Sequence, residues 1–388
     1  MAAPAARPCQ PQPVSTRDSS SPSPGSFHLS DREQWSSLLL RSARCQRPLL
    51  AHLNGDTSWL LQLPRPAHRH HPSRTHFNIL VDPWLRGPQS DVAGWFSTQW
   101  HLIPPSFDTV ADLDDALRDV EARTLLQLGS SPSSSNGRDG DAGDGLETEP
   151  CSDSRIDAVV VSHEFTDHCH QATLLEVSPH TPVFAPQVAA DLIRSWSHFD
   201  RVFTAPALQA RDDWSPAGLP AVDPLPDWIA IGRLVAPDNS LYYHSAMLVA
   251  FRLGNKDDGD DDSREAILYA PHGVQSRDLD GIRSSGLRPL ALLHGLHDVR
   301  IWMAKQLNLG ALDGIEAVAA TGARYWVATH DEDKKGAGLI APFLRRTRYS
   351  LKEAVHHQQQ RLREDPGHGE PPDYRFFELG SGDGLCLD

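Results

Sequence analysis

The fold is decided by residues 157–170, DAVVVSHEFTDHCH, in which a short apolar run is followed directly by a cluster of polar and imidazole side chains. The run Ala158–Val161 is β-branched at three positions and has no polar member, which predicts a strand buried on both faces. Metal-competent side chains follow it at once: His163, Asp167, His168 and, as a fourth candidate, His170. Ligands in layered α/β folds bind at the carboxyl ends of strands. Because imidazole nitrogen and carboxylate oxygen suit a borderline ion such as zinc, the stretch predicts a metal site.

Composition and charge exclude several classes of function. The chain has 388 residues, enough for one large domain or two small ones with a substantial core. Its formal net charge of −15 argues against binding to nucleic acid or to an anionic membrane, where a basic face is expected. A local cationic pocket for an anionic small-molecule substrate is still compatible with this charge. No apolar run approaches the roughly 18 residues of a membrane span.

The cysteines and the N-terminus bear on the cellular compartment. The five cysteines are scattered, odd in number and without a Cys-x-x-Cys pair, so we expect neither a disulfide framework nor a cysteine-only zinc site. The N-terminus lacks the apolar core of a secretory signal. It is free of acidic residues through Arg17, as organelle transit peptides are, but its prolines oppose an amphipathic helix. We therefore expect a cytoplasmic protein, with a transit peptide as the alternative.

Some segments are expected to lie outside the folded core. Residues 1–30 begin with a Ser/Pro/Ala-rich run and predict a disordered tail, and residues 129–155 predict a disordered acidic insertion. The acidic run Asp257–Ser263 lacks the correctly placed glycine and the terminal bidentate glutamate of a calcium loop, so we expect a solvated turn. The histidines of one basic loop either bind metal or, as we expect because nothing orders them, stay solvated: His68, His70 and His71.

The rest of the chain alternates between helix and strand patterns, without an internal sequence repeat. Helices are expected over Asp31–Arg44, Leu113–Leu128, Gln171–Val177, Gln187–Trp196, Gly310–Ala320 and Leu351–Leu362. Strands are expected over His52–Leu61, Phe77–Asp82, Ala158–Val161, Pro182–Ala185, Ile229–Val235, Leu241–Leu253, Glu265–Tyr269, Pro289–Leu293, Arg324–Ala328 and Tyr374–Leu379.

Histidines recur where the expected strands end. A single histidine at such a position is usually a structural group with satisfied hydrogen bonds. Several at the same kind of position indicate a shared site, because the carboxyl ends of parallel strands gather at one edge of a sheet. The four at strand ends are His163, His272, His294 and His330, and a fifth, His244, falls inside the expected strand Leu241–Leu253.

The order of these pieces resembles the metallo-β-lactamase superfamily. Ser162–His168 is similar to its His-x-His-x-Asp-His metal motif, with Phe165 in place of the second histidine. The Asp-Pro-Trp-Leu sequence at Asp82–Leu85 resembles the segment after the opening strands in one branch of that superfamily. The resemblance covers about residues 50–345. It implies an α+β fold, a four-layer αββα sandwich formed by residues 31–350 and completed by a helix and a strand in residues 351–388.

The resemblance also implies the metal ligands, which are His163, Asp167, His168, His244, His272 and His330. In the family pattern one ion takes His163, the residue at position 165 and His244. Phe165 removes a ligand from that set unless His272 or His294 substitutes for it. His272 stands where the family has a bridging aspartate, so the resemblance implies an altered bridge.

The second ion of the family pattern would take Asp167, His168 and His330. These three ligands leave an open position, as catalytic zinc sites do. We therefore expect one zinc ion in this group, with iron or manganese as alternatives. Phe165 is then the expected reason why the chain holds one ion and not two.

The activity implied by the resemblance is hydrolysis of an ester, lactone or phosphodiester bond by a metal-activated water. Asp167 is expected to orient or deprotonate that water, and His244 or His272, if free of metal, to donate a proton to the leaving group. Basic residues further on either meet a phosphate or form a solvated face: Lys334, Lys335 and Arg345. Two alternatives are a pseudoenzyme or binding protein that lost its metal through Phe165, and an iron-dependent redox enzyme on the same fold.

Overall fold

The computed structural model describes residues 25–388 apart from 67–68, 70, 72, 91–92, 130–153, 209–221, 236–242, 255–263, 280, 283–284, 302–304 and 365–372. Several expected features lie outside the described residues: the tail up to residue 24, nearly all of the acidic insertion, His68 and His70, and Asp257–Ser263.

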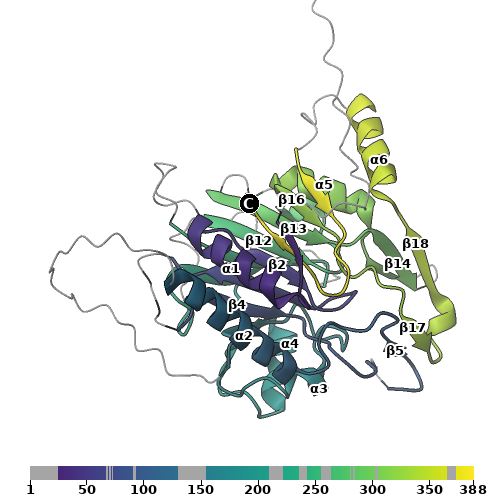
Figure 1. The fold of residues 1–388 in the computed structure, drawn as a ribbon. Coiled ribbons are helices and arrows are strands. Elements are labelled where there is room, and N and C mark those ends of the chain that lie inside the picture. The colour runs from purple at the N-terminus through teal and green to yellow at the C-terminus, as the bar shows by residue number, and fades with distance from the viewer. Residues whose placement is uncertain are drawn as a thin grey trace, which may run out of the picture.

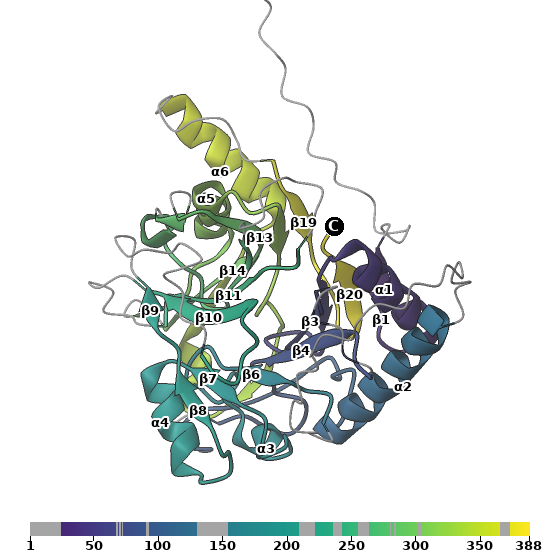
Figure 2. The same ribbon diagram turned by 90° about the vertical axis from the view of Figure 1, so that its left-hand side faces the viewer.

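Two large sheets form the centre of the molecule (Figures 1 and 2). The first has the order β1-β20-β2-β3-β4-β6-β7-β8, with β1 Ser26–His28, β20 Asp383–Cys386, β2 Leu49–His52, β3 Trp59–Pro64, β4 His76–Val81, β6 Ala158–Val160, β7 Val183–Ala185 and β8 Val202–Thr204. The second has the order β19-β16-β13-β12-β11-β10-β9, with β19 Arg375–Phe377, β16 Tyr325–Val327, β13 Leu287–His294, β12 Arg264–Ala270, β11 Ala246–Phe251, β10 Ile229–Leu234 and β9 Ala207–Leu208. Smaller sheets pair β15 (Lys305–Asn308), β14 (His297–Ile301) and β18 (Leu344–Arg348), and β17 (Lys335–Ala337) with β5 (Thr98–Trp100).

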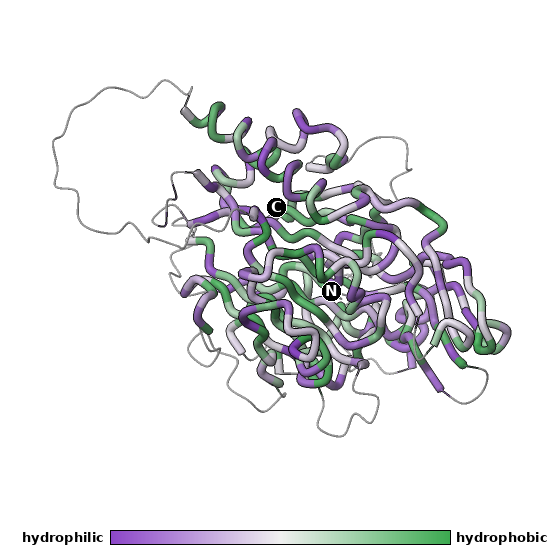
Figure 3. The backbone as a smooth tube through the Cα atoms, turned by 90° about the horizontal axis from the view of Figure 1, so that it is seen from below, coloured by the Kyte–Doolittle hydropathy of each residue, from purple (hydrophilic) through white to green (hydrophobic). Residues whose placement is uncertain are grey.

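Three hydrophobic clusters separate four layers. Successive strand residues face opposite sides, so in β6 Val159 packs toward the helices while Ala158 and Val160 pack toward the other sheet. The outer helices of the first sheet are α1 (Arg32–Cys45), α2 (Val110–Gly129), α3 (Gln171–Leu174) and α4 (Gln187–Ser195), and those of the second are α5 (Ala311–Thr321) and α6 (Leu351–Glu364). Apolar segments fill the interior in Figure 3. The predicted α+β, αββα sandwich is confirmed.

Parallel pairing brings the histidine-bearing strand ends together. In the first sheet β4, β6, β7 and β8 run parallel, and in the second β12, β13, β16 and β19 do. Their carboxyl-terminal loops carry the residues of the site described below. No helix among the described residues is long and apolar enough to cross a membrane.

One expected strand is a hairpin. Residues His52–Leu61, predicted as one strand, contain the end of β2, a turn and the start of β3. The Asn54 side chain explains the turn, since its Oδ1 accepts hydrogen bonds from the backbone N–H groups of Asp56 at 2.9 Å and Ser58 at 3.0 Å. The prediction was wrong because this local side-chain turn outweighs the strand pattern. Asp56 is thereby placed in a loop at the edge of the sheet.

Two other boundaries differ from the predictions, and the C-terminal segment adds one strand more than expected. His244 precedes β11 instead of lying inside a strand. The expected tail over residues 1–30 contains β1, which pairs with β20. The C-terminal residues complete both sheets, because β19 extends the second sheet while β20 lies between β1 and β2 of the first.

The ends of the acidic insertion lie far apart along α2. Gly129 ends the helix, whereas the Ser154 hydroxyl and the Arg155 N–H donate to Oδ1 of Asp114 in its first half. At about 1.5 Å per residue these points are about 22 Å apart, so a direct join would unwind the helix. We expect replacement of residues 130–153 by a ten-residue Gly/Ser linker to keep the melting temperature within a few degrees. A drop above about 10 °C in calorimetry would mean that the insertion packs on the core.

His76 makes the fold sensitive to acid. Its Nε2 lies 2.8 Å from the Ser42 hydroxyl and its Nδ1 lies 2.8 Å from that of Thr75. Burial, and then the charge of Arg65, lowers the pKa of His76 to about 3. Because this value lies below the unfolded value of 6.5, the unfolded chain binds more protons between the two, and stability falls as the pH drops from 6.5 toward 3.

We expect His76 to account for a loss of about 2–3 kcal/mol between pH 7 and pH 4.5. Urea unfolding at the two pH values measures it. His76→Gln, which keeps hydrogen-bonding groups but does not titrate, should reduce the pH dependence by that amount. His180→Gln, at a side chain that is 74% exposed, is the control and should leave the dependence unchanged. An equal pH dependence in the parent and in His76→Gln would contradict this account.

Candidate metal centre

Loops from both sheets meet at one buried cluster of potential metal ligands. His163, Asp167 and His168 follow β6, His272 follows β12, and His330 follows β16. They form two groups whose ligand atoms lie within 4.8 Å of one another, and His168 belongs to both. The imidazole group is His163, His168 and His272, and the carboxylate group is Asp167, His168 and His330.

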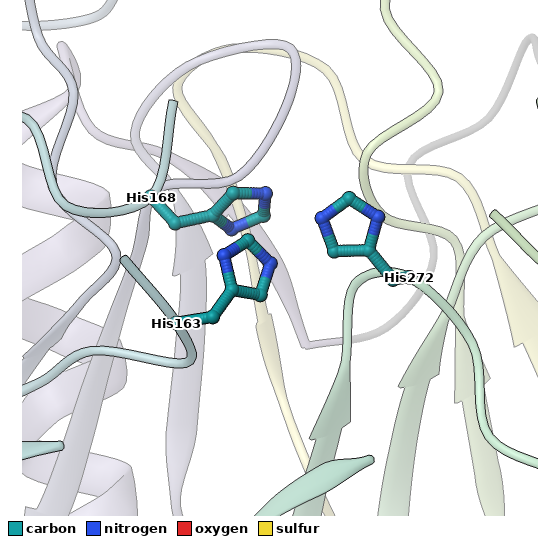
Figure 4. A group of neighbouring side chains, drawn as sticks. All are labelled: His163, His168 and His272. Carbon is teal, nitrogen blue, oxygen red and sulfur yellow. The ribbon is translucent and has the colours of Figure 1, made fainter. Parts of the chain in front are cut away.

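The rings of the imidazole group converge. Figure 4 shows the three side chains pointing toward one another, with ring centroids 3.9 Å apart for His163–His168, 4.4 Å for His163–His272 and 5.0 Å for His168–His272. Each Nε2 is buried, and no described residue forms a hydrogen bond with it. Buried polar atoms are nearly always partnered. Three that lack a hydrogen bond, in side chains whose ligand atoms lie within 4.8 Å of one another, fit the requirements of a metal ion.

Two of these rings are held in the tautomer that a metal needs. His168 Nδ1 lies 2.6 Å from the carboxylate of Asp82. His272 Nδ1 lies 2.8 Å from the side-chain oxygen of Asn308 and 3.2 Å from the Leu307 carbonyl. These acceptors keep the proton on Nδ1 and leave the Nε2 lone pair directed into the group.

His163 is held differently. Its Nδ1 accepts a long hydrogen bond of 3.4 Å from the N–H of Phe165. That contact favours a proton on Nε2, which binding of an ion would displace. The Phe165 ring lies beside the group, 4.9 Å from the His163 ring centroid and 5.9 Å from that of His272.

The electrostatics suit a bound cation. Burial, and then the neighbouring imidazoles, holds the pKa values of His163 and His272 well below the usual range, so both rings are neutral. At His168 burial acts in the same direction, but the carboxylates of Asp167 and Asp82 outweigh it and raise the pKa. A field that favours a proton on His168 also favours a metal cation at its Nε2.

The carboxylate group is shared with a lysine. His330 Nε2 lies 3.8 Å from Asp167 Oδ2, and its Nδ1 lies 3.0 Å from Asp56 Oδ1. Lys334 Nζ lies 2.6 Å from Asp56 Oδ2 and 2.8 Å from Asp167 Oδ2. Burial opposes ionisation of Asp167, but Lys334 and then the imidazoles of the site outweigh it and hold its pKa well below the usual range.

Sequence reasoning missed Asp56, and for Lys334 it offered only contact with a phosphate or a solvated face. Asp56 was hidden in the expected strand, although the Asn54-Gly-Asp turn sequence signals a loop. The Lys334 side chain is only 6% exposed, so the expectation of a solvated face is wrong for this residue. A lysine that follows His330 by four residues, after three acidic ones, was the available signal.

Two residues of the site adopt a left-handed backbone that non-glycine residues rarely use. His330 has φ of 59° and Asp82 has φ of 42°. Such conformations cost free energy and concentrate at functional sites. Here they turn the chain just after β16 and β4, so that the imidazole of His330 and the carboxylate of Asp82 face the centre.

Three other histidines considered from the sequence lie outside both groups. His244 Nε2 donates to the Leu307 carbonyl at 3.0 Å. The same carbonyl lies beside His272 Nδ1, so His244 neighbours the imidazole group without joining it. His294 Nδ1 lies 2.9 Å from the Gly295 carbonyl, and His170 caps the N-terminus of α3. Of the two substitutes expected for the lost motif histidine, the structure brings His272 to His163.

Comparison with known proteins gives similarity in fold at low sequence identity. No family model matches the chain, and no curated protein does. Similar solved structures include a possible metal-dependent hydrolase from Veillonella parvula (12% identity, TM-score 0.47, 87% of this chain and 99% of that one). An isothiocyanate hydrolase from Delia radicum gut bacteria has 13% identity and a TM-score of 0.47, covering 87% of this chain and 98% of that one. The metallo-beta-lactamase fold protein YhfI from Bacillus subtilis has 11% identity and a TM-score of 0.37, covering 87% and 99%.

The fold class follows from this chain's own features. Its two central sheets, packed face to face between outer helices, agree with the αββα sandwich that the sequence resemblance implied.

Proposed function

We propose that the chain is a metal-dependent hydrolase whose single ion is held by His163, His168 and His272. The observation that supports this proposal most strongly is the convergence of three buried Nε2 atoms without hydrogen-bond partners among the described residues. Three neutral imidazoles with room for a fourth ligand are a known catalytic zinc set. Iron and manganese also accept imidazole ligands, so zinc is the first metal to test.

The ion and the residues around the imidazole group would have separate roles in hydrolysis. When bound, the ion supplies Lewis-acid polarisation and a nucleophile at neutral pH. Asp167, which contacts the group through His168, would accept the proton of the attacking water. The Lys334 ammonium keeps Asp167 ionised and places positive charge where an anionic transition state needs it. The substrate class remains an ester, lactone or phosphodiester of a small molecule.

The test combines metal content with turnover. The full chain is stripped with a chelator, reloaded with zinc, manganese or iron, and assayed with p-nitrophenyl acetate, a γ-lactone and bis-p-nitrophenyl phosphate. We expect about one ion per chain and turnover of one substrate class, and His272→Ala should lose both. A protein that binds no ion under any loading condition would refute the proposal.

One observation favours a second function, binding without turnover. The carboxylate expected to act as the base, Asp167, is already paired with the Lys334 ammonium. Stoichiometric metal without turnover of the three substrate classes would favour this pseudoenzyme or binding protein. The iron-dependent redox alternative expects no hydrolysis by any form and consumption of dioxygen and a reductant by the iron-loaded protein alone, which an oxygen electrode measures.

A further inference from the structure

The ammonium group of Lys334 occupies the carboxylate group in the way a metal ion would. Its Nζ bridges Asp56 and Asp167 at 2.6 and 2.8 Å. It also lies 5.3 Å from the centre of the Trp84 ring, which shields it on one side. We propose that Lys334 acts as a built-in cation that closes the Asp167–His168–His330 group to metal and limits the chain to one ion.

Competition for one carboxylate is the first argument. An ion in the carboxylate group would take an oxygen of Asp167 at about 2.0–2.2 Å. Lys334 Nζ already contacts Oδ2, which is also the oxygen nearest to His330 Nε2. A divalent ion would therefore lie against a buried ammonium, and their repulsion is strong where little water screens it.

The balance of charge is the second argument. Three carboxylates contact the imidazole group, the carboxylate group or Lys334, and they belong to Asp56, Asp82 and Asp167. With one ammonium and one divalent ion beside neutral imidazoles, these three negative charges sum to zero. A second divalent ion would leave a buried excess of two positive charges, which is costly unless anions accompany it.

Hydrogen bonds from two other segments of the chain hold the loop that carries Lys334, and this is the third argument. Asp331 accepts hydrogen bonds from the N–H groups of Leu296 and His297. Glu332 accepts from the N–H groups of Leu102 and Ile103. These bonds fix the backbone from which Lys334 reaches Asp56 and Asp167, so the ammonium can leave the group only if the lysine side chain itself changes rotamer and breaks both ion pairs.

This inference rests on the proposed metal site, and it departs from the sequence-based expectation that Phe165 explains a single ion. The test measures zinc per chain after dialysis against a weak chelator. Lys334→Met keeps an unbranched side chain beside Trp84 and removes the charge. We expect one ion in the parent, two in Lys334→Met, and one in Phe165→His. Lys335→Met, at the exposed neighbour, is the matched control and should bind one.

Further variants locate the added ion and guard against misfolding. In Lys334→Met/His330→Ala the second ion should be lost and the first kept. Since Lys334→Met leaves two buried carboxylates without their cation, Lys334→Gln is the second variant: its neutral amide can still donate hydrogen bonds to them, and it should also bind two ions if Lys334→Met fails to fold.

The outcomes separate the two proposals. Two ions in the parent or in Phe165→His, or no gain in both Lys334→Met and Lys334→Gln, would overturn the role of Lys334. A parent without metal would refute the proposed function alone, provided that Lys334→Met then gains one ion that depends on His330. No metal in any of these proteins would refute both.

Discussion

His168→Ala is expected to lower zinc affinity by at least about 100-fold and to abolish turnover. The residue contributes Nε2 to both ligand groups, and its Nδ1 is held by Asp82 at 2.6 Å. Removing an outer-shell partner of a metal ligand already costs about 10–100-fold in affinity, so losing a shared ligand costs more. Competition with a chromophoric chelator gives the affinity, and kcat/KM gives the activity.

His294→Gln is the matched control for this experiment. His294 is also fully buried at a strand end, yet its ring lies outside both groups. The substitution should lower the melting temperature while zinc binding remains within about threefold of the parent. Equal loss of zinc in both variants would mean that the effect comes from damage to the fold, and normal binding by His168→Ala would remove this residue from the ligand set.

Asp82→Asn is expected to weaken zinc binding by about 10–100-fold without changing the stoichiometry at saturation. The carboxylate accepts from His168 Nδ1, from the Ser162 hydroxyl and from the Ser162 N–H, so it both orients the ring and raises its basicity. Asparagine tolerates the left-handed backbone at this position, which limits structural damage. The chelator competition used for His168 measures the change.

Asp157→Asn provides the comparison for Asp82→Asn. Asp157 is a largely buried carboxylate just before β6 that pairs with Arg74 at 2.7 Å, away from the imidazole group. Its loss should lower the melting temperature and leave zinc affinity unchanged. An unchanged affinity in Asp82→Asn would show that the Asp82 charge does not tune His168.

Much of the fold was predictable because burial leaves a clear pattern. The β-branched run Ala158–Val161 is a buried strand segment, and the Asp31 cap and the helix α1 lie where the sequence predicted them. The hairpin at Asn54 was not predicted, because a side chain that bonds its own backbone overrides the strand pattern over a few residues.

The sequence predicted which histidines and aspartates belong to the site better than it predicted which of them lie together in one group. His163 and His168 lie on one loop, but His272 follows a strand of the other sheet, and sequence spacing says nothing of the distance between sheets. Lysine side chains are rarely buried unless paired, so the sequence favoured a solvated face for Lys334 over contact with a phosphate. Its contacts with Asp56 and with Asp167, which are far away in the chain, explain its burial.

The most direct test of the single-ion imidazole centre is a crystal structure of the zinc-loaded protein with anomalous difference maps at the zinc edge. We predict one peak per chain within about 2.0–2.1 Å of the Nε2 atoms of His163, His168 and His272, with Lys334 still paired to Asp167. A peak bonded to Asp167 and His330, with the lysine displaced, would contradict the account.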